Sequence, residues 1–205
     1  MKILAFVDIH GDSAAIKKIA EKEKKGKPDL LVCSGDISNF GFGLFSLIKR
    51  LSFGIPLLIV PGNHETEEEI EYMGRKTDFV KNIHLKHFIS DSYFFAGCGG
   101  GGFTPHHAEF EQSEKKFASA IKNLKVKNHK YKIILVTHQP PYGTKLDYLD
   151  YLGRHVGSVS IRKFIEKYQP VLCVCGHLHT NFGKMDKIGK TIVINPGPEG
   201  KIIEI

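Results

Sequence analysis

The sequence predicts an α/β fold, and three observations support that prediction. Short apolar runs with the character of buried strands alternate along the chain with amphipathic stretches of helical character. Several apolar runs end in carboxylate, amide or imidazole residues, which is typical of the ligand-binding edge of an open α/β sheet. The length of 205 residues, with 41% hydrophobic and 25% charged residues, suits one globular domain spanning residues 1–205.

The first half of the chain consists of repeated strand and helix units. Aliphatic and β-branched runs without charges predict strands, whereas stretches that mix charges with periodic apolar residues predict helices. The predicted strands are "ILAFV" (3–7), "LLVC" (30–33) and "IPLLIV" (55–60), and the predicted helices are "SAAIKKIAEKEKK" (13–25), "FGLFSLIKRL" (42–51) and "EEEIEYM" (67–73). This order indicates βαβ organisation.

The second half begins with a predicted hairpin and returns to the same alternation. The hairpin comprises "IHLKHFI" (83–89) and "SYFFAGC" (92–98), and a flexible glycine-rich loop (99–102) follows it. By the same criteria we expect helices at 111–125 and 158–168, strands at 132–137 and 171–175, and short strands near 182–184, 191–195 and 201–205. A long loop separates the strand at 132–137 from the second of these helices.

Composition limits the classes of function. The formal net charge of +7 permits an anionic partner, but much of the excess lies in lysine-rich, helix-like blocks that usually form solvated faces. The start "MKILAFVDIHGD" is too short and too acidic for a signal peptide, and no apolar run approaches the roughly 20 residues of a membrane span. We therefore expect a cytoplasmic protein without a membrane partner. The 4 cysteines are scattered, and three of them lie in apolar strand-like runs, so we expect core residues rather than a disulfide or thiolate site.

Chemistry-bearing residues follow five of the predicted core strands. They are Asp8 and His10 after the first, Asp36 after the second, Asn63 and His64 after the third, His138 after the fourth, and His177 and His179 after the fifth. Residues two apart in extended backbone project to the same side, so Asp8 converges with His10, and His177 with His179. Any single motif is explained as well by a turn or a helix cap, but five in succession predict a metal site.

These motifs, D-x-H, G-D, G-N-H-E, H and G-H-x-H, resemble the calcineurin-like metallophosphoesterase superfamily over nearly the whole chain. The resemblance is closest to Icc-related predicted phosphoesterases, through "CGGGGFTP", "THQPPYGTKLD", "RHVGSVSIRKFIEKYQP" and "NPGP". It implies a four-layer αββα sandwich, in which two packed mixed β-sheets are flanked by helices, and a dinuclear metal centre. Implied for one metal are Asp8, His10, Asp36 and His179, and for the other Asp36, Asn63, His138 and His177, with Asp36 bridging.

The ligand set also indicates the metal and the reaction. Oxygen and imidazole ligands without thiolate favour manganese, iron, zinc or cobalt, and manganese is preferred here. A water bridging two such ions becomes hydroxide near neutral pH and can attack phosphorus, so we predict a hydrolase of phosphoesters. In the resembling family the residue corresponding to His64 does not bind metal, and here it would protonate the leaving oxygen or stabilise the transition state. Asp36 and His64 are the predicted catalytic residues.

The substrate is expected to be a small nucleotide or a similar diester, which makes the protein a phosphodiesterase. The segment "GDISNFG" lacks the arginine-bearing G-D-x-x-D-R-G motif of protein serine/threonine phosphatases. Two alternatives remain: a nuclease with the same centre, and a non-catalytic binding module. The oligomeric state stays open.

Candidate substrate-binding residues lie in the loops. Arg154 and His155 precede a plausible helix start at Ser158, where a cation and backbone N–H groups could meet a phosphate. His106 follows the glycine-rich loop. Phe40, Phe42 and Phe45 are expected to pack in the core, although the first two could instead line a nucleobase pocket.

Overall fold

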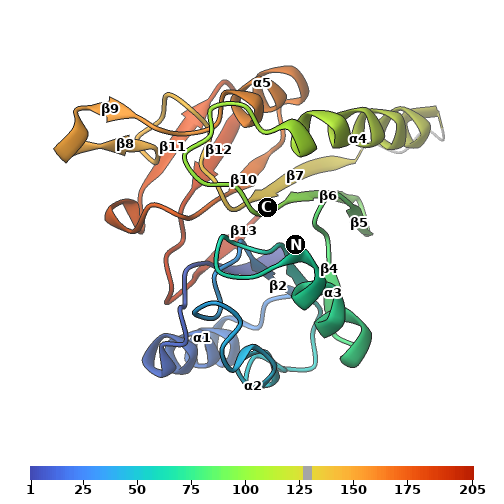
Figure 1. Ribbon diagram of the computed structural model, residues 1–205. Helices are drawn as coiled ribbons and strands as arrows, with labels where there is room; N and C mark the ends of the chain where they lie inside the picture. Colours follow the sequence, from blue (N-terminus) through green and yellow to red (C-terminus); the bar gives the residue numbers. More distant parts are fainter. Residues whose placement is uncertain (127–130) are drawn as a thin grey trace.

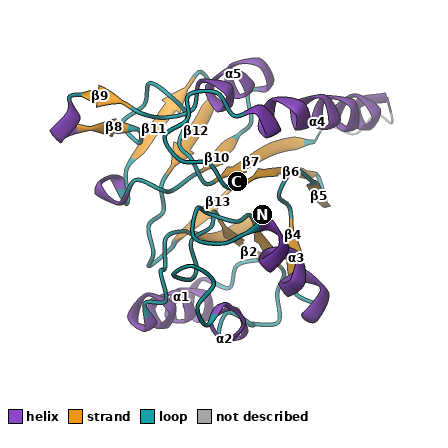
Figure 2. Ribbon diagram, viewed as in Figure 1, coloured by secondary structure: helices purple, strands orange, loops and turns teal. Residues whose placement is uncertain are grey.

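The computed structural model describes residues 1–126 and 131–205, which form two sheets packed face to face with helices outside (Figure 1). The first sheet has the order β13-β1-β2-β3-β4 and the second the order β11-β12-β10-β7-β6-β5. Figure 2 shows the resulting layers, with strands inside and helices on both outer faces. The expected four-layer αββα arrangement of two mixed sheets is confirmed.

The first sheet collects the strands of the first βαβ units together with the last strand of the chain. Its strands are β1 (Lys2–Phe6), β2 (Leu30–Cys33), β3 (Leu57–Ile59), β4 (Val80–Asn82) and β13 (Lys201–Glu204). β1 to β4 are parallel neighbours, whereas β13 pairs antiparallel with β1. The chain therefore ends beside its own start, and the N–H of Ile205 donates to the carbonyl of Met1 at 3.0 Å.

The second sheet contains β5 (His87–Ser90), β6 (Tyr93–Cys98), β7 (Lys132–Thr137), β10 (Leu172–Val174), β11 (Met185–Ile188) and β12 (Thr191–Ile194). The predicted hairpin is present as the antiparallel pair of β5 and β6. β6, β7, β10 and β12 are parallel neighbours, so the carboxyl ends of β7 and β10 lie at one edge. A separate two-stranded hairpin is formed by β8 (Tyr148–Leu149) and β9 (Arg154–His155) inside the predicted long loop.

Alternation along the strands explains why two sheets pack together. Leu4 and Phe6 of β1 face a core shared with α1 (Ser13–Gly26), α2 (Leu44–Lys49) and α3 (Glu67–Lys76). Ile3 and Ala5 face the opposite way, into a core between the two sheets. The second sheet repeats this division, with α4 (Ala108–Val126) and α5 (Val159–Tyr168) on its outer face. Both faces of each sheet are thus buried, as apolar parallel strands require.

The helix starts follow local capping chemistry. The side chain of Asp12 accepts a hydrogen bond from the N–H of Ala14 at the start of α1, and Ser158 accepts from Ile161 in the same way at α5. All four cysteines are buried and free, as expected for core residues. Among the described residues, no helix is both long and apolar enough to cross a bilayer.

The expectation that Phe40, Phe42 and Phe45 pack in the core is wrong. α2 begins only at Leu44, and the preceding loop leaves Phe40 78% and Phe42 87% exposed, while Phe45 is 40% exposed on the helix surface. Phe40 and Gly41 adopt positive φ, which ends any helical continuation toward the strand. The loop therefore turns its aromatic rings outward.

Candidate metal centre

The predicted ligands come together at one end of the sandwich. Asp8, His10, Asp36 and Asn63 follow β1, β2 and β3 of the first sheet, whereas His138, His177 and His179 follow β7 and β10 of the second. Close contacts join the two sheets here: the N–H of His177 donates to Oδ2 of Asp8 at 3.0 Å, and Nε2 of His138 lies 2.9 Å from Oδ1 of Asn63. The carboxyl ends of the parallel strands of both sheets thus supply one site.

The backbone at these strand ends is held in an unusual conformation. Asp8, His10, Asp36 and His177 have φ values of 55°, 49°, 54° and 68°. Residues with a side chain adopt this left-handed region at a cost of about 1–2 kcal/mol each, and such strain is concentrated at functional sites. Gly35 and Gly62 lie backbone to backbone, and a Cβ on Gly62 would overlap the carboxylate of Asp36. The close approach of these two turns places Asp36 in the middle of the cluster.

Asp36 lies between imidazoles from the two sheets. Its Oδ2 is 3.7 Å from Nε2 of His10 and 3.5 Å from Nε2 of His138. Its other oxygen, Oδ1, accepts a hydrogen bond from the N–H of His64 at 2.9 Å, which fixes the carboxylate plane. Both separations from Oδ2 are too long for good hydrogen bonds, and they are close to the about 3–3.5 Å expected between two ligand atoms that each lie about 2.1 Å from one ion.

Hydrogen bonds behind two of the imidazoles set their tautomers. Nδ1 of His138 lies 2.8 Å from the carbonyl oxygen of Ser34, which can only accept, so Nδ1 carries the proton. The amide nitrogen of Asn39 donates to the carbonyl of His10 at 2.9 Å, which turns Oδ1 of Asn39 toward Nδ1 of His10 at 3.1 Å. In the neutral form of each ring the lone pair is therefore on Nε2, the atom that faces Asp36.

Imidazole nitrogens and side-chain oxygens from both sheets converge in this cluster at short range. The lone pair on Nε2 of His138 faces Oδ1 of Asn63, and the same oxygen lies 2.9 Å from Nδ1 of His177. Nε2 of His179 is 3.1 Å from Nε2 of His10 and 3.9 Å from Oδ1 of Asp8. Oδ1 of Asp8 has no hydrogen-bond partner among the described residues. If Oδ1 of Asn63 faces Nε2 of His138, two acceptors repel each other there, and a cation between them would remove the repulsion, so the residues fit a divalent metal.

Burial keeps three imidazoles of the cluster in the neutral form that binds metal, whereas it acts against ionisation of Asp8. Desolvation, with a smaller contribution from His138, lowers the pKa of His177 to about 4. Burial also lowers the pKa of His138 and of His179, so these imidazoles are neutral at physiological pH. Burial and then the charge of Asp36 raise the pKa of Asp8 to about 8, which reflects carboxylates collected without a compensating cation. A bound cation would supply that compensation.

His64 is half-buried beside the cluster. Its ring packs edge-on against His10, with centroids 4.6 Å apart, and against the exposed ring of Phe40 at 4.2 Å. Nδ1 of His64 has no hydrogen-bond partner in the described part of the chain. One nitrogen of this ring also lies within 4.8 Å of ligand atoms of His10 and Asp36, so it is close enough to act beside them.

Two residues that support the cluster were not assigned a role from the sequence. Glu65 is buried and accepts hydrogen bonds from the backbone N–H groups of Asp36, Ser38 and Gly62 and from the hydroxyl of Ser38, at 2.7–3.2 Å. Asn39 orients His10 as described above. A signal for Glu65 did exist, since an acidic residue directly follows His64 in the short G-N-H-E turn, but its partners Ser38 and Asp36 lie 27 and 29 positions away.

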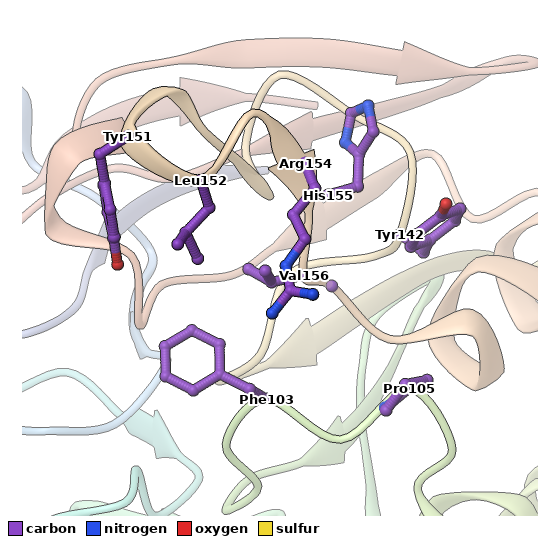
Figure 3. Close-up of a pocket in the computed structure, with 9 residues that line it drawn as sticks. Phe103, Pro105, Tyr142, Tyr151, Leu152, Arg154, His155 and Val156 are labelled. Carbon is purple, nitrogen blue, oxygen red and sulfur yellow. The ribbon is translucent and has the colours of Figure 1, made fainter.

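The predicted substrate-binding residues are separated by the structure. Arg154 and His155 form β9 and line a pocket of about 410 Å³, drawn in Figure 3. The ring of His155 is directed to Asp147, with Nδ1 2.9 Å from Oδ1 of that buried carboxylate. His106 is exposed, does not line this pocket, and lies 3.5 Å from Glu111. Its neighbour His107 is buried, and its N–H donates to the hydroxyl of Ser160.

The sequence is similar to a known protein family and to individual proteins of other organisms. The sequence profile of calcineurin-like phosphoesterases matches residues 1–181. The chain is 39% identical to the uncharacterized protein MJ1162 of Methanocaldococcus jannaschii, over 99% of this chain and 91% of that protein. It is 28% identical to the probable glycerophosphodiester phosphodiesterase GpdQ of Arcobacter nitrofigilis, over 76% of this chain and 58% of that protein, so it spans less than two thirds of that relative.

The fold also resembles solved structures. The crystal structure of TT1561 of Thermus thermophilus superposes with a TM-score of 0.71 at 21% identity, covering 97% of this chain and 90% of that one. At this level of identity the likeness concerns the fold alone.

Proposed function

The chain belongs to the calcineurin-like phosphoesterase family, and from that premise we propose that it hydrolyses small phosphodiesters with a pair of divalent metal ions. The family is divalent-metal dependent, and the chain is a phosphoester hydrolase. The phosphodiesterase assignment draws on the match to the probable glycerophosphodiester phosphodiesterase. Manganese is the preferred metal, because the ligand set combines carboxylate, amide and imidazole donors without thiolate.

One observation carries the two-ion proposal. Oδ2 of Asp36 lies between Nε2 of His10 and Nε2 of His138, at 3.7 and 3.5 Å, and both nitrogens present lone pairs. A carboxylate oxygen in that position suits a bridging ligand with an ion on each side. The proposed ligands of one ion are Asp8, His10, Asp36 and His179, and those of the other are Asp36, Asn63, His138 and His177.

The chain's own residues then have distinct tasks. When bound, the ions would supply positive charge for the phosphate and acidity for an attacking water. Asn39 and the carbonyl of Ser34 hold two ligand imidazoles in the required tautomer. Glu65 fixes the loops that carry Asp36 and Asn63. His64 is proposed to donate a proton to the leaving oxygen, because its half-buried ring lies beside His10 and Asp36 and is held by two aromatic contacts.

A non-catalytic binding module would not require this arrangement. Among the described residues, the ring of His64 forms no hydrogen bond that would give this side chain a structural role, yet the ring lies beside the cluster. Among the described residues that line the adjoining pocket, Arg154 is the one lysine or arginine, so we do not propose a nuclease.

The test is metal content and activity measured on the same protein. Metal-stripped wild-type protein, Asp36→Asn and the control Asp78→Asn would be reconstituted with manganese, desalted and subjected to elemental analysis, with bis(4-nitrophenyl) phosphate as substrate. Asp78 is an exposed acidic residue next to β4. We expect two ions per chain and turnover in the wild type and the control, and loss of both ions and of activity in Asp36→Asn. One ion or none in folded wild-type protein would overturn the two-ion proposal.

A further inference from the structure

We infer that the pocket beside the metal centre binds the nucleoside arm of a nucleotide-type phosphodiester; the inference rests on the proposed function and names the substrate class. The pocket of about 410 Å³ lies between the loop after β6 and the β8–β9 hairpin (Figure 3). It adjoins the centre, because Phe103, one of its lining residues, has its ring 5.0 Å from the ring of His177. This volume is in the range of small-molecule sites.

The walls of the pocket are unusually apolar for an exposed surface. Phe103 is 59%, Tyr151 75% and Leu152 46% exposed, and Tyr142 is also exposed. Single exposed apolar residues are common, but four around one hollow mark a binding surface. Figure 3 shows Phe103 opposite Leu152 and Tyr151, with the guanidinium of Arg154 pointing into the space between them and Pro105. Flat apolar walls of this kind suit a planar aromatic group.

The charge of the pocket selects an anionic ligand. Arg154 forms no hydrogen bond or ion pair within the described part of the chain, and no acidic residue is among the described residues that line the hollow. An arginine left free beside aromatic rings can pair with a phosphate oxygen and stack on a base. A nucleoside joined to phosphate offers both groups, whereas a glycerol arm would leave the aromatic walls unused.

The hairpin that carries Arg154 is anchored and does not need to form on binding. The fully buried carboxylate of Asp147 accepts from the backbone N–H groups of Gly143, Thr144 and Gly157 at 3.0, 2.6 and 3.0 Å and contacts His155. The buried amide of Asn181, two residues after His179, donates to the carbonyls of Leu146 and Tyr148. The hairpin and the ligand-bearing loop are therefore fixed to each other, and a preorganised wall lowers the cost of binding.

The experiment compares two substrates with the same leaving group. Thymidine 5′-(4-nitrophenyl) phosphate and methyl 4-nitrophenyl phosphate differ only in the second ester arm. We expect manganese-loaded wild-type protein to prefer the thymidine ester in kcat/KM by about tenfold or more, the range that stacking of one base provides. Tyr151→Leu, Phe103→Leu and Arg154→Ala should each reduce this preference by about threefold or more. The exposed Tyr72 and Arg75 on α3 supply the controls Tyr72→Leu and Arg75→Ala, which should keep it.

A binding measurement separates this inference from the proposed function. Adenosine 5′-monophosphate and glycerol 3-phosphate share a phosphate monoester. Calorimetry should show tighter binding of the nucleotide by the wild type, and each of the three pocket variants should reduce that difference in affinity. If both esters are hydrolysed and neither the kinetic nor the binding assay shows a preference for the nucleoside, the pocket inference is overturned and the proposed hydrolase activity remains. Nucleotide binding that depends on the pocket, without turnover of either ester, would support the pocket and count against the hydrolase. Circular dichroism and melting curves would establish that each variant folds.

Discussion

Glu65→Gln should destabilise the protein although it changes one oxygen to an amide nitrogen. Oε2 of Glu65 accepts from the N–H groups of Asp36 and Gly62, and Oε1 accepts from the N–H and the hydroxyl of Ser38. The new amide NH₂ would settle toward Ser38, because the hydroxyl there can reverse and accept. The N–H of Ser38 then loses its acceptor.

The magnitude follows from these four contacts. One buried N–H without a partner costs about 1–3 kcal/mol, and the remaining bonds weaken because the acceptor is no longer ionised. Burial raises the pKa of Glu65, so removing a desolvated charge recovers part of that loss. The balance is a free energy of unfolding lower by about 2 kcal/mol, which at a urea m-value of about 2 kcal/mol/M lowers the midpoint by about 1 M.

Urea denaturation of the metal-free chain, followed by circular dichroism, would measure this difference. Glu68→Gln is the matched control, since Glu68 is an exposed residue in the first turn of α3 and its substitution should change stability by about 0.5 kcal/mol or less. Equal midpoints for the two variants would refute the account of Glu65 as the residue that fixes the loops around Asp36.

Three further predictions concern the centre itself. His64→Ala should keep both metal ions but lower kcat by about 10²–10⁴-fold for alkyl esters, as expected for the loss of a proton donor. The loss should be smaller for 4-nitrophenyl esters, whose leaving group needs no proton. If loss of metal accounts for the whole decrease in kcat, His64 is not the proton donor. Diesters should be hydrolysed with a higher kcat/KM than monoesters of the same aryl alcohol, because a diester needs less compensating charge and gains more from His64; a clear monoester preference in matched assays would reverse the assignment. Gly62→Ala should weaken manganese binding in a chelator competition, since the new Cβ would overlap the carboxylate of Asp36. The control Gly102→Ala, whose Cβ meets nothing within 4 Å, should bind manganese like the wild type. Equal manganese affinities of the two variants would contradict this packing argument.

The parts of the fold that followed from the sequence are those in which burial alone determines the structure. "LLVC" and "KIILVT" coincide with β2 and β7, because uninterrupted apolar residues match strands covered on both faces. β4 was not anticipated, since only Val80 of its three residues is buried and the stretch lacks an apolar pattern. The two-residue strands of the β8–β9 hairpin were also missed, because Asp147 and not periodicity holds that segment in place.

Some residues of the candidate site could also be predicted from the sequence, and others could not. Residues directly after strands could be grouped, because parallel strands deliver their ends to one edge, and the structure brings these residues together. Glu65 and Asn39 could not be assigned, since their roles depend on hydrogen bonds between loops that are distant in sequence. Phe40 and Phe42 were misplaced because hydrophobicity predicts burial, whereas a loop with positive φ turns both rings into solvent.

Because the two sheets share the cluster, the proposed ions would hold the sheets together across this edge of the sandwich. Each proposed ligand set takes residues from both sheets, and His138 reaches across to Ser34 and Asn63. Neither sheet alone could hold an ion in this way, and any motion that parts the sheets at this edge opens both coordination shells together. The rate at which a chelator strips the metal would then report how often the sandwich opens, and substrate, lying over the same seam, would slow that opening while it is bound.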